Sequence, residues 1–149
     1  MKKRERNHHG GYVKVGVLST TSKRSDGGPT NAYIGAMHEF GSPSRNIPAR
    51  SWLEMPLIHE KETIVEEVAS AEASHEFLKS GDFRKFLMLL GLSAVKAIHL
   101  AFETGGFGDW KPLKVETIAR KKRKGSSYPD SILVDTASLA KSVAYEVIT

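Results

Sequence analysis

The chain contains no cysteine among its 149 residues, so a disulfide framework, thiolate catalysis and thiolate metal ligands are all excluded. It also has no continuous run that approaches the roughly 20 apolar residues required to span a membrane. The basic start, Met1 to Arg6, is not followed by the apolar core of a secretory signal. We therefore expect a soluble protein, made in a cytoplasm, without a membrane partner.

The composition that is present fits one compact domain. A hydrophobic content of 40% over this length is enough to bury a core without metal or disulfide support. We expect residues 1–11 to form a flexible basic tail and residues 12–149 to form a single domain, with a mobile loop at 19–30. The net charge of +5 permits nucleic acid or an acidic protein surface as a partner, but it does not decide between them.

Hydrophobic periodicity predicts an α+β fold. Alternating valines predict a strand from Tyr12 to Leu18, and the alternation of Tyr145 and Val147 predicts a final strand that pairs with the first one. This pairing would bring the two termini together. The expected architecture is a small antiparallel sheet, formed partly by these terminal strands, packed against two long helices and shorter helical turns.

Three segments have helical spacing. Asn31 is a suitable N-cap for a short helix that ends at Phe40. Ser51 and Glu54 form a possible capping box for a long amphipathic helix with an acidic outer face. A second long helix is expected over residues 83–103. It is apolar around most of its circumference, so it is buried either within the domain or between subunits.

The pair His38-Glu39 is the first candidate for chemistry. Adjacent residues on a helix diverge by about 100°, so these two side chains do not converge on one ion. A zinc-protease arrangement would need a second histidine at position 42, which is a serine. The pair therefore fits a structural hub better than a catalytic or metal site.

The loop that follows contains apolar residues beside arginine, a combination typical of docking surfaces. Ile47, Pro48 and Trp52 could contact a partner beside Arg50, or they could fold back onto the core of their own chain. Both interpretations remain open from the sequence.

A run of five cations comprises Arg120, Lys121, Lys122, Arg123 and Lys124. Mutual repulsion predicts an exposed basic loop, which would be solvated, contact DNA without sequence specificity, or dock an acidic protein. No nucleic-acid-binding motif surrounds the run, so base-specific recognition has no support.

No catalytic constellation is apparent. The six histidines are scattered without metal-ligand spacing, and the chain has neither a phosphate-binding glycine loop nor a nucleophile elbow. We predict that the protein is not an enzyme and has no cofactor, no metal site and no catalytic residue.

Four motifs occur together along the chain: 36–41 (AMHEFG), 47–53 (IPARSWL), 110–113 (WKPL) with 117–121 (TIARK), and 133–139 (LVDTASL) with Ser142, Val143 and Tyr145. Together they resemble the tail-completion and virion-morphogenesis proteins of tailed bacteriophages, a family that includes neck and head-tail joining proteins. The last motif precedes the others in many members, so the order here resembles a circularly permuted subset. Ala137 stands where the family usually has glycine, and Ser51-Trp52 stands where Pro-Phe is common.

The resemblance implies a structural role in the virion. Such a protein forms a ring, of six copies, between the capsid portal and the tail tube, and it completes the tail or joins it to the head. The implied partners are further copies, other neck, tail-terminator or tail-tube proteins, and packaged DNA. The implied location is the virion, and the host cytoplasm during assembly.

Two groups of residues are the candidate contacts. The candidate subunit or partner interface comprises Phe40, Ile47, Pro48, Arg50, Trp52 and Trp110, and the candidate contact with DNA or an acidic partner is the basic run at 120–124. The alternatives are a nonspecific DNA-binding protein, a tail terminator, and a metal-dependent hydrolase using His38 and Glu39.

Overall fold

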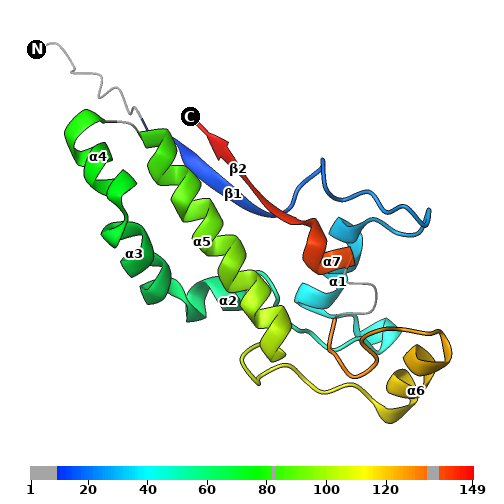
Figure 1. The fold of residues 1–149 in the computed structure, drawn as a ribbon. Helices are drawn as coiled ribbons and strands as arrows, with labels where there is room; N and C mark the ends of the chain where they lie inside the picture. The colour runs from blue at the N-terminus through cyan, green and yellow to red at the C-terminus, as the bar shows by residue number, and fades with distance from the viewer. Residues whose placement is uncertain (1–9, 82, 134–137) are drawn as a thin grey trace, which may run out of the picture.

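The computed structural model describes residues 10–81, 83–133 and 138–149. Its central element is the helix α5 (Phe83–Thr104). A two-stranded sheet packs along α5, and helices α2 (Glu54–His59), α3 (Lys61–Ser70) and α4 (Glu72–Ser80) also pack against it (Figure 1). The predicted tail lies almost entirely outside the described residues.

The sheet consists of strand β1 (Tyr12–Val17) and strand β2 (Val143–Ile148). They are antiparallel, with Tyr12 opposite Ile148 and Val17 opposite Val143. The predicted pairing of the terminal strands is therefore confirmed, and so is the α+β class. β2 can approach α5 closely because position 91 is glycine: a Cβ atom there would lie 2.3 Å from the ring of Tyr145.

The predicted long helix after Glu54 is wrong, because three short helices occupy this part of the chain. The backbone leaves helical geometry at Ala71, where φ is −71° and ψ is 142°, and α2 gives way to α3 at Glu60. These breaks keep the segment on α5: Ile64 packs in a small core with Ala97, and the ring of Phe77 lies 5.5 Å from that of Phe86. A straight helix would carry its end away from α5.

The short helix α1 (Asn31–Phe40) has the predicted bounds, but its N-cap is Thr30 rather than Asn31. The Thr30 hydroxyl accepts a hydrogen bond from the Tyr33 backbone nitrogen at 3.2 Å. Asn31 is buried and donates through its amide to the Ser138 carbonyl oxygen at 3.3 Å. Gly41 ends the helix with a φ of 73°.

The connecting segments contain short helices. A 3₁₀ turn, η1 (Pro43–Arg45), lies in the loop after α1. Helix α6 (Val115–Arg123) follows the 111–114 segment, and α7 (Ser138–Ser142) leads directly into β2. In the segment predicted to be a mobile loop, the Ser22 carbonyl accepts a bond from the Asn31 nitrogen at 2.8 Å.

The main core lies around the C-terminal half of α5, where segments from both halves of the chain meet. Its buried members are Trp52, Ile98, Ala101, Phe102, Trp110, Leu139 and Val143. By length and composition α5 could cross a membrane, which corrects the expectation that no segment approaches that requirement. In this fold α5 packs against both strands and three helices, as the core helix of a domain does.

Candidate interaction surface

Glu39 links the end of α1 to the start of α2. Its carboxylate accepts backbone hydrogen bonds from Trp52 at 2.8 Å, Leu53 at 3.0 Å and Glu54 at 3.2 Å, and a hydroxyl bond from Ser51 at 2.7 Å. The first backbone donors of a helix have no partner within the helix, and a negative charge there is favourable. Glu39 therefore caps α2 from another element, which supports the hub interpretation of this residue.

The predicted capping box is wrong in its details. The Ser51 hydroxyl accepts from the Met55 backbone nitrogen at 2.9 Å, but the backbone donors nearest the start of α2 are satisfied by Glu39 rather than by Glu54. A sequence pattern within four residues could not reveal a cap that comes from an earlier helix.

Arg50 joins the loop to the segment before α6. It is 7% exposed, and it donates from Nε to the Lys111 carbonyl at 2.7 Å and from Nη2 to the Pro112 carbonyl at 3.3 Å. Its backbone nitrogen donates to the His38 carbonyl at 2.7 Å. Burial, together with the charge of Arg50, lowers the pKa of His38. Nδ1 of His38 is buried and has no hydrogen-bond partner among the described residues.

Two tryptophans complete the unit. Trp52 donates from Nε1 to the Gly35 carbonyl at 2.8 Å, and Trp110 donates from Nε1 to the Ser51 carbonyl at 3.0 Å. Gly35 permits this approach, since a Cβ atom there would lie 2.7 Å from the Trp52 ring. We call α1 and residues 47–53 and 110–112 the hub, because these hydrogen bonds hold the three segments together.

The predicted interface residues fall into two groups according to the exposure of their side chains. The side chains of Trp52 and Trp110 pack in the core of their own chain, so they do not fit as direct contacts with a partner. Arg50 is also buried, but its side chain lines the groove described below and is open only to a narrow group. For Trp52, the alternative of folding back onto the core is the observed one. Phe40 is 79% exposed, and Ile47 and Pro48 are half-buried at the surface, so these three remain candidate contacts.

A groove opens between the hub and α6, and we call it the basic groove. Its lining includes Phe40, Ile47, Pro48 and Leu113 as apolar residues. No aspartate or glutamate of the described residues lines it, whereas eight cations do: Arg24, Arg45, Arg50, Lys111, Lys114, Arg120, Lys121 and Lys124. The sequence did not single out Arg45, Lys111 or Lys114, because no local pattern reveals that three separate segments meet.

The basic run was predicted to be a loop, and this prediction is wrong. The run forms the last turn of α6 and the residue after it. Lys121 is 8% exposed, contrary to the expectation that all five cations are exposed, and donates from Nζ to the Ser131 carbonyl at 2.9 Å. Lys122 and Arg123 are exposed and do not line the groove. The helical spacing therefore divides the run between the groove and the outer surface.

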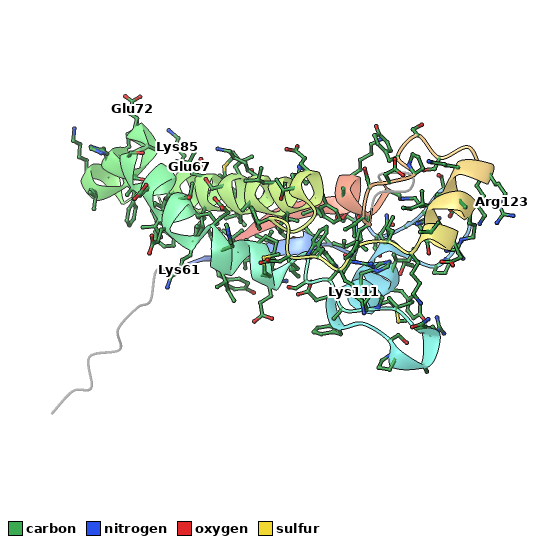
Figure 2. All side chains as sticks on the ribbon, turned by 90° about the horizontal axis from the view of Figure 1, so that it is seen from below. Lys61, Glu67, Glu72, Lys85, Lys111 and Arg123 are labelled. Atoms are coloured by element: carbon green, nitrogen blue, oxygen red, sulfur yellow. The ribbon has the colours of Figure 1, made fainter. Side chains whose placement is uncertain are left out.

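Charge of the opposite sign lies at the other end of the molecule. Helices α3 and α4 together carry five glutamates and two lysines. We call α3 and α4 the acidic end. Figure 2 shows Glu67 and Glu72, together with Lys61 and Lys85, toward this end, and Lys111 and Arg123 in the other half of the molecule.

The chemistry of a metal site is not assembled by the described residues: they contain no group of three or more histidine, aspartate or glutamate side chains that could hold an ion. His38 and Glu39 do not act as a pair, since the Glu39 carboxylate already accepts hydrogen bonds from Ser51 and Trp52 in the hub. Comparison of the chain with family models, curated proteins and solved structures finds no match.

Proposed function

We propose that this chain is a structural protein of a bacteriophage virion, in the neck or tail, whose copies associate head to tail into a ring. The ring would complete the tail or join it to the head. The family resemblance supports this proposal, and three of its four motifs supply the residues that build the hub. Their role in the hub is mechanical, since Glu39, Arg50 and Trp110 hold backbone segments together.

The observation that carries the ring proposal is the separation of charge. The acidic end and the basic groove lie at opposite ends of one elongated chain (Figure 2). A contact between them would use a different surface on each of two copies. Contacts of this heterologous kind repeat from copy to copy, and they close into a ring when the rotation between copies permits.

The test is the mass of the particle in solution, measured by light scattering with and without tail-tube protein. The monomer has a mass of 16.4 kDa. We expect a discrete assembly several times heavier, seen as rings by electron microscopy and bound to one end of isolated tails. A strict monomer that never associates with phage tails contradicts the proposal. Binding to tails that already carry a terminator would favour the tail-completion role. Binding to tails that lack a terminator would favour the terminator role.

A second candidate function is nonspecific DNA binding, which the acid-free lining of the basic groove favours. Binding through phosphate contacts weakens steeply as salt rises. Fluorescence anisotropy with labelled duplex DNA at several salt concentrations measures this dependence. Binding in the absence of self-association would favour the second candidate.

A further inference from the structure

The floor of the basic groove contains a buried charge without a counter-ion. Arg50 has only carbonyl oxygens as hydrogen-bond partners, and no carboxylate of the described residues lies within ion-pair distance of it. A buried charge is costly unless it is paired. The groove is therefore suited to an anionic group that comes from outside the chain.

The groove lining favours a protein segment over a nucleic acid backbone. Phe40, Ile47 and Leu113 contribute apolar surface, for which phosphates offer no partner. The phosphates of a duplex could reach cations on the rim, but a guanidinium that is 7% exposed at the floor is accessible only to a narrower group. A carboxylate on a side chain meets that requirement.

The same chain carries a matching surface at its acidic end. Glu62, Val65 and Glu66 share one face of α3, because they are spaced by three and four residues. All three are exposed, and neither glutamate forms an ion pair with a described residue. By contrast, Glu67 is already paired with Lys96.

We propose that the α3 face of Glu62, Val65 and Glu66 docks into the basic groove of a second copy. α3 lies in the half of the molecule away from α6 and the groove, so one copy cannot close the contact on itself (Figure 1). The two glutamates supply the carboxylates that the groove lacks, and Val65 meets its apolar lining. This inference rests on the proposed ring and names the two surfaces of its repeating contact.

Charge reversal on each surface tests the contact. Lys111→Glu with Lys114→Glu reverses the rim of the groove, and Glu62→Lys with Glu66→Lys reverses the docking face. Like charges would then oppose each other, and either double variant alone is expected to self-associate roughly 100-fold more weakly than the wild type. Mixing the two variants restores attraction at both kinds of contact, so the mixture is expected to assemble again.

A matched control separates the groove from general basicity. Lys122→Glu with Arg123→Glu makes the same change in charge at the end of α6, on residues that do not line the groove. This control is expected to assemble like the wild type. Circular dichroism and urea unfolding verify that each variant is folded. If a charge-reversal variant does not fold, the neutral variants K111Q/K114Q and E62Q/E66Q are used in its place. Each neutral variant is expected to weaken self-association.

Several outcomes would overturn the inference. If the wild type forms rings and the groove variant does too, the ring stands and the proposed contact is wrong. Failure of two folded reversal variants to assemble when mixed leads to the same conclusion. A wild type that stays monomeric overturns both the contact and the ring. If the groove variant loses only duplex binding in anisotropy, the groove is a nucleic acid site instead.

Discussion

Glu39 accepts the backbone hydrogen bond of Trp52 at 2.8 Å, across 13 positions of the chain. The same carboxylate accepts hydrogen bonds from the backbone nitrogens of Leu53 and Glu54 and from the Ser51 hydroxyl. One acidic side chain thus fixes the angle between α1 and α2 and positions Trp52 for the core. The pair His38-Glu39 suggests chemistry in the sequence, but in the structure Glu39 has a structural role as the cap of α2.

We predict that Glu39→Gln lowers the free energy of unfolding by about 2–3 kcal/mol, because the new amide cannot accept at both positions and places a donor against backbone donors. Urea unfolding followed by tryptophan fluorescence measures the loss. Glu103→Gln is the control, since Glu103 is exposed and lies outside the hub and the docking face, and its effect is expected to stay within about 0.5 kcal/mol. Equal effects of the two substitutions would contradict the cap.

Arg50→Lys is expected to cost about 1–3 kcal/mol although the positive charge is kept. Lysine cannot reach the Lys111 and Pro112 carbonyls together in the planar geometry of a guanidinium. Hydrogen exchange should show faster exchange of the 111–125 segment, with α5 unaffected. The exposed Arg45→Lys serves as the matched conservative change. Unchanged exchange of 111–125 in the Arg50 variant would show that these bonds do not hold α6 to the hub.

Gly91→Ala is expected to destabilise the chain by about 1–3 kcal/mol, against the usual helix preference for alanine. The added methyl would lie 2.3 Å from the Tyr145 ring, so α5 and β2 would have to separate. Chemical unfolding gives the size of the effect, and Leu92→Ala on the exposed side of α5 should change stability little. A stabilising Gly91→Ala would mean that β2 does not pack on α5 as described.

The lowered pKa of His38 makes stability depend on pH. When the pH falls below 6.5, the ordinary pKa of histidine, His38 takes up a proton in the unfolded chain. The folded chain resists this protonation, because the ring is half-buried beside Arg50. The wild type should therefore lose stability as pH falls from 7.5 toward the folded-state pKa, and His38→Gln should remove that part of the loss. Unfolding free energies of both proteins at a series of pH values provide the measurement. Parallel pH profiles would contradict this assignment.

Local patterns predicted α1, α5 and the paired terminal strands because each pattern records which side chains must leave water. The valines of β1 alternate, and Gly41 and Gly105 stop helices by adopting positive φ. These properties belong to a few neighbouring residues, so no knowledge of the rest of the fold is needed.

The predictions that failed depended on distant partners. Helical periodicity continued through Glu60 and Ala71, but the chain bends there to remain packed on α5. The basic run appeared uniformly exposed, yet Lys121 turns inward to the Ser131 carbonyl. Neither the bend nor the buried lysine has a signal within its own segment.

The sequence by itself determined the α+β class, the central helix and the presence of separate acidic and basic segments, since these follow from composition and periodicity. Only the tertiary structure decided that Glu39 is a cap, that Trp52 and Trp110 are buried, and that Arg45, Arg50 and Lys114 meet in one groove. The physical reason is that hydrogen bonds and burial between segments depend on how the chain returns on itself, which no single stretch of residues specifies.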